Sequence, residues 1–379
     1  MQFISTRGEE RVTGAQAIVK GIASDGGLFV PASFPAVTRE ELEGMLTMDY
    51  PERAAFILHK YLDEYDKEEL LSPLKKAYSQ FEGGDAAPLV RVENGMYMLE
   101  LFHGPTCAFK DMALTVLPYL LRKGCDIVGI RENILILVAT SGDTGKAALE
   151  GFKDADGIRI MVFYPDDGVS KMQKLQMCTQ EGSNVNVVAV KGNFDDCQTG
   201  VKKIFASEEC KRALAQKGYL LSSANSINFG RLAPQICYYF SAYCDLVTSD
   251  QIAMGEKVNF TVPTGNFGNI LAAYYAKQMG LPVGTLVCAS NKNNVLTDFW
   301  NKGTYDVKRP FYKTMSPSMD ILVSSNLERL IFEPSGRDPA LTRGRLAQPH
   351  ATGGNSRRAE DVQTGHTACL RRPATQPPQ

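Results

Sequence analysis

After Pro88 the chain alternates short apolar runs rich in β-branched residues with stretches of helical periodicity. The apolar runs cover residues 134–138, 158–163, 185–190, 258–262 and 285–288. Strands that are apolar throughout, and are separated by helices, are typical of a parallel sheet covered on both faces. The pattern therefore predicts an α/β fold with doubly wound parallel sheets.

Composition restricts the kinds of partner that the chain can bind. The 379 residues are 44% hydrophobic, enough for the cores of two or three domains, and carry a net charge of -1. A chain without a broad basic field is not expected to bind nucleic acid or an anionic membrane, so small molecules or a second copy of the chain are the expected partners.

The cysteines and the chain start point to the cytoplasm. Nine cysteines are present, with no CxxC pair and no Cys/His cluster at metal-ligand spacing. We therefore expect reduced thiols and no metal site. The first ten residues lack the apolar stretch of a signal peptide, and no later run reaches membrane-spanning length.

Changes in texture divide the chain into three parts. Residues 1–84 are charged and helix-rich and are predicted to form a leading domain, and residues 85–343 carry the α/β pattern of a catalytic domain. Residues 344–379 contain several arginines and prolines but no aromatic residue and no lysine. Such a composition buries too little apolar surface to offset its ordering entropy, so we expect this tail to be disordered.

Lys110 is the strongest candidate for chemistry. It follows a loop-like Gly104-Pro105 step, opens an apolar helical pattern and is bracketed by Phe109 and Met112. Apolar surroundings lower the pKa of an amine and make it a nucleophile that can form a Schiff base. The alternative is a lysine whose stem covers apolar surface while its ammonium stays in water.

A first loop at a strand end offers an anion site. The run that ends at residue 138 leads into a polar loop, and a helix is expected from Lys146. The candidate residues in this loop are Thr140, Ser141, Gly142, Asp143 and Thr144. Hydroxyls and backbone N–H groups at a helix N-terminus bind a carboxylate or phosphate, although a simple cap by Asp143 or Thr144 would use the same groups. The glycine spacing is wrong for an ATP-binding loop.

Two further clusters favour anions. The second strand-end loop contains Gly265, Asn266, Phe267, Gly268 and Asn269. Its glycines let the backbone approach a phosphate, although a structural turn has the same composition. A third cluster contains Asn225, Ser226, Asn228 and Arg231. An arginine there could clamp an anion with two parallel hydrogen bonds.

The motifs resemble those of the threonine synthase family, which shares the pyridoxal-phosphate fold (fold type II) of the tryptophan synthase β chain. The matching segments are residues 5–8, 25–28, 103–106 with 109–111, 140–145, 225–228 with Arg231, 265–269, 316–320 and 325–329. They occur in the order of the family and cover roughly residues 1–343. The resemblance implies two doubly wound α/β subdomains with a helix-rich N-terminal domain.

The resemblance also implies a cofactor and a reaction. Lys110 would carry pyridoxal 5'-phosphate, and Gly265–Asn269 would bind its phosphate. The loop 140–144 would hold the substrate carboxylate or the ring hydroxyl of the cofactor, with Asn225, Ser226, Asn228 and Arg231 near the substrate phosphate. Family members convert O-phospho-L-homoserine and water to L-threonine and phosphate.

Two alternatives stay open. One is another lyase or dehydratase of the same fold that acts on serine, threonine or cysteine precursors. The other is a catalytically silent pyridoxal-phosphate-binding protein, because the resemblance ends near Arg343 and the catalytic domain is expected to be incomplete there. We expect a monomer or a homodimer.

Overall fold

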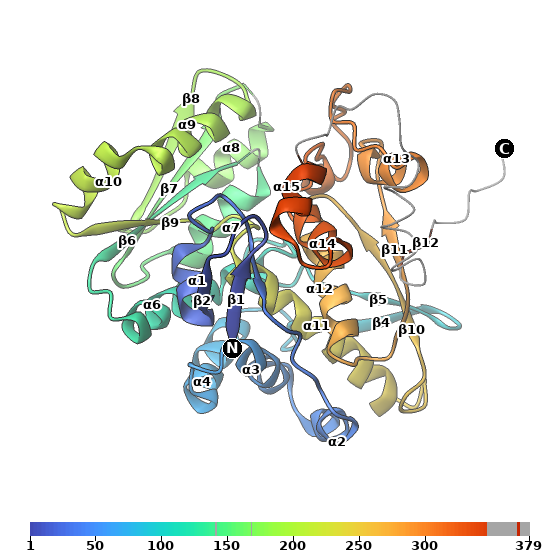
Figure 1. Ribbon diagram of the computed structural model, residues 1–379. Coiled ribbons are helices and arrows are strands. Elements are labelled where there is room, and N and C mark those ends of the chain that lie inside the picture. Colours follow the sequence, from blue (N-terminus) through green and yellow to red (C-terminus); the bar gives the residue numbers. More distant parts are fainter. Residues whose placement is uncertain (141, 168, 347–369, 372–379) are drawn as a thin grey trace. The chain divides into compact units, whose positions relative to one another are not determined.

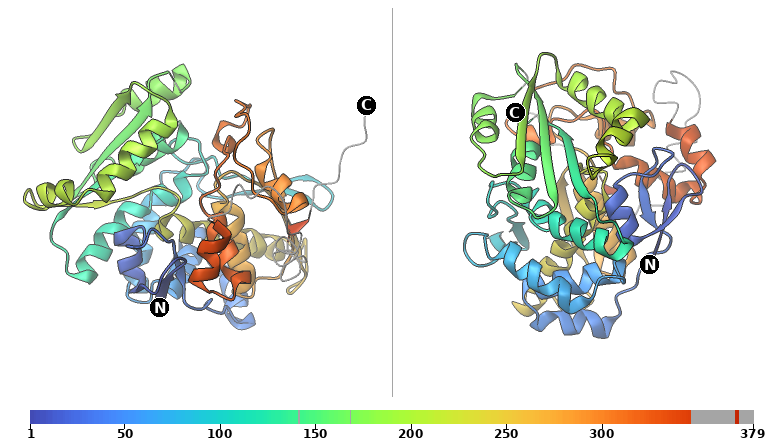
Figure 2. Two further views of the ribbon diagram at one scale, coloured as in Figure 1. Left: turned by 45° about the horizontal axis from the view of Figure 1, so that its top comes forward. Right: turned by 90° about the vertical axis from the view of Figure 1, so that its left-hand side faces the viewer.

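The computed structural model describes residues 1–140, 142–167, 169–346 and 370–371 (Figures 1 and 2). The chain forms two compact units, each assembled from several stretches. The first comprises Met1–Phe3, Val12–Ile22 and Met48–Ala242, and the second comprises Ile4–Arg11, Ala23–Thr47 and Tyr243–Gln379. Residues 1–84 are thus shared between both units, and the predicted domain boundary at residue 84 stays a prediction.

A four-stranded parallel sheet organises the first unit. Its strands are β6 (Asn133–Ala139), β7 (Ile158–Pro165), β8 (Val185–Val190) and β9 (Tyr219–Ser222), in the order β8-β7-β6-β9. All neighbours are parallel, which confirms the α/β prediction (Figure 1). The strand order reverses at β6, so the loops after β6 and β9 flank a topological switch point, where open α/β sheets bind ligands.

Helices surround this sheet. Helix α9 packs on β6 and β7, α10 packs on β9, and α7 packs on β7. The helices of the first unit are α1 (Gly14–Lys20), α3 (Tyr50–Tyr61), α4 (Lys67–Tyr78), α5 (Asp111–Leu114), α6 (Leu117–Val128), α7 (Asp143–Phe152), α8 (Lys171–Cys178), α9 (Phe194–Ala206), α10 (Glu208–Ala215) and the first two thirds of α11 (Phe229–Thr248). The unit also contains an antiparallel hairpin of β4 (Leu89–Glu93) and β5 (Met96–Leu99).

Local sequence explains where the leading helices begin. Asp49 caps α3 and exchanges hydrogen bonds with Glu52 in a capping box, with Pro51 in the first turn. Such a box satisfies backbone N–H groups that the helix itself cannot pair. The buried face of α3 contacts α11, where Arg53 donates to the Ser241 hydroxyl at 2.9 Å.

The second unit is built on a parallel pair of strands with a helical crossover. Strand β10 (Val258–Pro263) leads through α12 (Gly268–Gln278) to β11 (Val283–Ala289), and β12 (Leu370–Arg371) pairs with β11. The other helices of this unit are α2 (Arg39–Gly44), α13 (Val295–Lys302), α14 (Leu327–Phe332) and α15 (Pro339–Leu346), with short 3-10 turns at Met45–Thr47, Pro317–Met319 and Glu333–Ser335. The strands β1 (Gln2–Ser5), β2 (Arg11–Thr13) and β3 (Phe29–Pro31) form a sheet in the order β2-β1-β3.

The structure corrects the expected tail in part. Gly344, Arg345 and Leu346 continue helix α15, and Leu370 and Arg371 form β12. The expectation of disorder was therefore wrong for these five residues, because helix and strand hydrogen bonds order them; the rest of 344–379 lies outside the described residues. Within the described ranges no helix has both the length and the apolar character to cross a membrane.

Candidate active site

The loop that leads to Lys110 is stabilised by hydrogen bonds between its own residues. Both oxygens of the buried Asp111 carboxylate accept hydrogen bonds from Thr106, one from the backbone N–H at 2.8 Å and one from the hydroxyl at 2.6 Å. A side chain at Gly104 would lie 2.5 Å from the Asp111 Cβ, so this position requires glycine. The local motif thus fixes the backbone that presents Lys110 at the start of α5.

Lys110 is buried beside a carboxylate. Its side chain is 9% exposed, and its Nζ lies 3.9 Å from Oδ2 of Asp143. Burial lowers the pKa of Lys110 to about 8; the negative charge of Asp143 opposes this shift and the positive charge of Arg231 adds to it. A lysine that only covers apolar surface would keep its ammonium in water, so that alternative is wrong.

The first strand-end loop is held by its own threonine. The buried Thr140 hydroxyl accepts from the N–H groups of Gly142 and Gly145, both at 3.0 Å, and donates to the Gly142 carbonyl at 3.1 Å. Asp143 is the first residue of α7, whose N-cap residue is Gly142 and has no capping side chain; the Thr140 hydroxyl instead accepts the Gly145 N–H of the first turn. A cap by Asp143 or Thr144 is therefore wrong, while Ser141 lies outside the described residues.

Gln173 orients the Asp143 carboxylate. Its Nε2 donates to Oδ1 of Asp143 at 2.8 Å, and its Oε1 accepts the N–H of Ser170 at 3.2 Å. The second bond fixes which end of the amide faces Asp143. We did not predict this residue from the sequence; the available signal was the capping box that Ser170 and Gln173 form at the start of α8.

The loop after β9 lies beside the loop after β6, because Ile136 of β6 pairs with Ser222 of β9. The amide of the fully buried Asn228 is used inside the protein: it donates to the Ile18 and Ser223 carbonyls, each at 2.9 Å, and accepts from Gly230 N–H at 2.8 Å. Asn228 therefore shapes this loop. Asn225 and Ser226 belong to the same turn, where the N–H of Asn225 donates to the Ser223 hydroxyl at 3.2 Å.

Arg231 is a buried cation with spare donor capacity. Its Nη1 donates to the Ala224 carbonyl at 2.7 Å, whereas its Nε has no hydrogen-bond partner among the described residues. Burial lowers the pKa of this guanidinium to about 10. A buried arginine with an unused N–H suits an anionic ligand, since unpaired buried donors are costly.

The second unit carries the glycine-rich loop at the end of β10. The carbonyl of Gly265 accepts from the Ser324 hydroxyl at 2.6 Å, and that of Asn266 accepts from the Asn326 N–H at 3.0 Å. Phe267 has a left-handed backbone, with φ of 65°, and is the N-cap residue of α12, where its apolar side chain makes no cap. An αL residue at a helix start forms a concave nest of N–H groups that binds anions.

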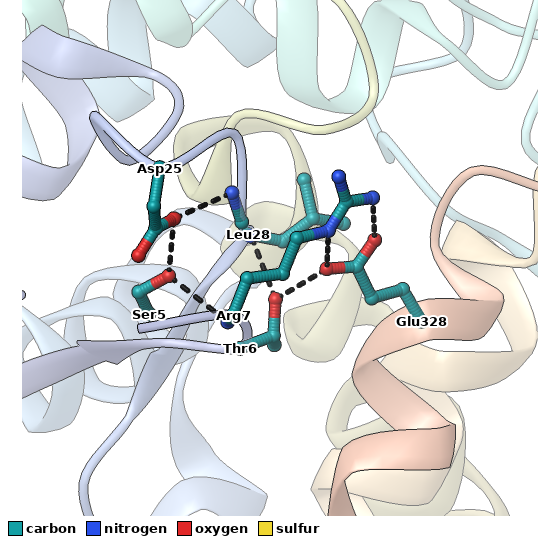
Figure 3. Close-up of polar contacts among 7 residues, drawn as sticks. Ser5, Thr6, Arg7, Asp25, Leu28 and Glu328 are labelled. Carbon is teal, nitrogen blue, oxygen red and sulfur yellow. Dashed lines mark hydrogen bonds and ion pairs between the residues drawn. The ribbon is translucent and has the colours of Figure 1, made fainter. Parts of the chain in front are cut away.

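The motif at the start of the chain, residues 5–8, holds helix α14 through hydrogen bonds. Oε1 of the buried Glu328 accepts from Thr6 Oγ1 at 2.5 Å and from Arg7 Nε at 2.8 Å, and its Oε2 accepts from Arg7 Nη2 at 2.6 Å (Figure 3). The Ser5 hydroxyl donates to Asp25 at 2.8 Å in the same network (Figure 3). These motif residues join the start of the chain to helix α14 within the second unit.

The residues fit an aldehyde cofactor with a phosphate arm. Each unit by itself carries a feature that suits one part of such a cofactor: Lys110 in the first is a buried amine of lowered pKa, and the loop before α12 in the second has the shape of an anion-binding nest. These are the features of enzymes that carry pyridoxal phosphate on a lysine. Residues 2–78 match the family described as threonine synthase N terminus, and residues 84–338 match the family described as pyridoxal-phosphate dependent enzyme. The chain belongs to the threonine synthase family of pyridoxal-phosphate-dependent enzymes.

Individual relatives agree with this membership. Threonine synthase-like 1 of Homo sapiens is 43% identical over 89% of this chain and 48% of its own length, so the chain spans about half of that relative. Threonine synthase of Pseudomonas aeruginosa is 42% identical over 89% of this chain and 70% of that protein. The crystal structure of pyridoxal-phosphate-bound threonine synthase from Brucella melitensis has a TM-score of 0.88 and 39% identity, over 98% of this chain and 78% of that one.

Proposed function

We propose that this chain is a cytoplasmic threonine synthase that converts O-phospho-L-homoserine and water to L-threonine and phosphate. The observation that carries the proposal is the buried Lys110 amine beside Asp143, in a chain of the threonine synthase family. We expect it to bind its substrate and at most a second copy of itself. We do not expect it to bind nucleic acid or a membrane.

Lys110 has two roles in this proposal. It carries the cofactor, and once the substrate amine has replaced it, the free amine moves protons among the reacting carbons of the substrate. A pKa of about 8 suits both tasks, because roughly one lysine in ten is then unprotonated at pH 7, against about one in 3,000 at the ordinary value. Bound pyridoxal phosphate supplies an electron sink for the substrate α-carbon.

The remaining predicted residues receive separate roles. Gly265, Asn266, Phe267, Gly268 and Asn269 bind the cofactor phosphate through backbone N–H groups. The loop with Thr140, Ser141, Gly142, Asp143 and Thr144 binds the substrate carboxylate or the cofactor ring hydroxyl. Arg231 binds the substrate phosphate with Asn225 and Ser226, and Asn228 holds their loop in shape, since its amide is already fully used.

The test compares two lysines of the first unit. Lys110→Ala is expected to remove the absorbance band of a lysine-bound cofactor near the visible–ultraviolet border and to lower phosphate release from O-phospho-L-homoserine by about 10³-fold or more. Lys146→Ala is the control: Lys146 lies on α7, where it pairs with Glu150 at 2.9 Å, and its loss should leave the band and the rate unchanged. A band that persists in Lys110→Ala would contradict the assignment.

Substrate choice separates the alternatives. A threonine synthase releases phosphate from O-phospho-L-homoserine and forms no keto acid from serine or threonine. Keto-acid formation without phosphate release would favour another lyase or dehydratase of this fold. Cofactor binding without turnover of any of these compounds would favour a silent binding protein.

A further inference from the structure

The segment from Ser324 to Glu328 holds the glycine-rich loop of the second unit through hydrogen bonds to its carbonyl groups. Ser324, which is 6% exposed, donates its hydroxyl to the Gly265 carbonyl at 2.6 Å. Two residues later, the backbone N–H of Asn326 donates to the Asn266 carbonyl at 3.0 Å. Two successive carbonyls of the loop are therefore fixed by one short segment.

Because peptide bonds are planar, these two hydrogen bonds also fix the direction in which the following N–H groups point. In a planar trans peptide the N–H of one residue points opposite to the carbonyl of the residue before it. The described residues contain no cis peptide bond, so the N–H groups of Asn266 and Phe267 point away from Ser324 and Asn326. The left-handed Phe267 then leads into the helical N–H groups of α12, so the donors form a nest on the side opposite Ser324 and Asn326.

The segment from Ser324 to Glu328 is itself tied to the start of the chain. Glu328 accepts three hydrogen bonds from Thr6 and Arg7, at 2.5, 2.8 and 2.6 Å (Figure 3). The fully buried Arg329 donates to the Phe29 carbonyl at 2.9 Å and to the side-chain oxygen of Asn326. Asn326 is thus held by its neighbour in α14, and α14 is held by the N-terminal segment.

We propose that Ser324 is a positioning residue for the cofactor phosphate, and that the network of Thr6, Arg7 and Glu328 holds it in place. The inference rests on the proposed function, because the cofactor phosphate is the anion that the loop would bind. Ser324 does not touch the phosphate; it aims the N–H groups that do. Its loss should therefore weaken recognition of the phosphate and not of the pyridine ring or aldehyde.

The experiment compares two ligands that differ only in the phosphate. Dissociation constants of pyridoxal phosphate and of pyridoxal are measured by absorbance titration of the full chain. Ser324→Ala is expected to bind pyridoxal phosphate about 3- to 10-fold more weakly, the size of one hydrogen bond, with pyridoxal binding unchanged. Ser324→Thr keeps the hydroxyl and should restore the preference for the phosphorylated ligand.

Ser335→Ala is the matched control for the hydroxyl. The Ser335 hydroxyl also donates to a backbone carbonyl, that of Ile331 at 2.8 Å, it accepts from Arg345 at 2.9 Å, and the residue is 5% exposed. Its removal should cost at least as much stability but leave the ratio of the two dissociation constants unchanged. Equal weakening of both ligands by Ser324→Ala, or no weakening, would overturn the positioning role.

The anchoring role of Glu328 is tested by comparing its ion pair with Arg7 with the ion pair of Glu333 and Arg337. Glu328→Gln weakens the contact to Arg7 and is expected to lower the phosphate preference about 2- to 5-fold. Glu333→Gln is the control, because Glu333 makes the same two-bond contact with Arg337 at 2.9 and 3.0 Å. If Glu328→Gln and Glu333→Gln give the same ratio of the two dissociation constants, Glu328 does not anchor the loop. A wild-type chain without a Lys110-dependent band would overturn the proposed function as well, whereas a wild-type band with an unchanged ratio in Ser324→Ala would overturn only this inference.

Discussion

Two loops of the same design, one in each unit, are stabilised in different ways. Each follows a parallel strand with a buried threonine, Thr140 after β6 and Thr264 after β10, and each leads into a helix whose N-cap residue, Gly142 or Phe267, has no capping side chain. The first loop is held by the Thr140 hydroxyl, whereas the second is held by Ser324, 59 residues further along the chain. Both loops can be recognised from local sequence, but only the first also contains the residue that holds it; the residue that holds the second lies too far along the chain to be identified in this way.

The largest predicted effect tests this difference directly. Thr140→Val removes a hydroxyl that makes three hydrogen bonds inside its loop and leaves the buried Gly142 N–H without a partner, so we expect a loss of about 3 kcal/mol in the free energy of unfolding. Thr264→Val removes the bond to the Val262 carbonyl at 2.8 Å and a weaker contact with the Cys288 thiol, and should cost about 1 kcal/mol. Urea unfolding of both variants gives the comparison, and equal losses would show that the two loops are not held differently.

Glycine substitutions provide the next test. Gly142 has φ of 157°, and a Cβ there would lie 2.2 Å from Nε2 of Gln173, so Gly142→Ala should cost about 2 kcal/mol through backbone strain and a displaced glutamine. At Gly265 the nearest atoms, from Ile321, Met319 and Ser318, lie 3.1–3.3 Å away, and small shifts can relieve the contact. Gly265→Ala should therefore cost less than half as much in the same unfolding measurement. A larger loss for Gly265→Ala would reverse the comparison.

The same difference explains what the sequence could and could not predict. The strands that flank the loops were predicted within two residues of their observed ends, because continuous apolar runs mark buried parallel strands. Lys110 was predicted because its apolar neighbours are adjacent in the chain and because two remote loops offered anion sites. The roles of Gln173 and Ser324 were not predicted, since each acts on a residue 30 or 59 positions away. Strand β9, with four residues, was too short to stand out.

The buried charge of Lys110, beside the first loop, lowers the stability of the folded chain. Because burial lowers the pKa of Lys110 to about 8, the folded protein disfavours its charged form, and this cost is fully present below pH 8 and disappears as the pH rises to 10.5. Lys110→Met should therefore stabilise the cofactor-free chain by about 1–2 kcal/mol at pH 7 and give little or no gain near pH 10.5. Urea unfolding at both pH values measures the difference. A gain that does not depend on pH would show that packing, not charge, is responsible.

The smallest predicted effect makes the first loop resemble the second, which has no carboxylate between Gly265 and Asn269. Asp143→Asn removes the main charge that raises the pKa of Lys110, while burial and Arg231 still lower it and Asp111 still raises it. The pKa of Lys110 should therefore fall below about 8, and the amine should become a few-fold more reactive near neutral pH. The pH dependence of its reaction with pyridoxal phosphate, trapped by borohydride and located by mass spectrometry, reports this value.

Glu150→Gln is the matched control for that measurement. Glu150 is a carboxylate of the same helix, α7, but it pairs with Lys146 at 2.9 Å and is not among the charges that shift the pKa of Lys110. Its removal should leave the reactivity profile of Lys110 where it is in the wild-type chain. If Asp143→Asn and Glu150→Gln give the same profile, the 3.9 Å contact between Asp143 and Lys110 does not set the charge of the amine. The two loops would then differ in how they are held and not in the effect of their charge.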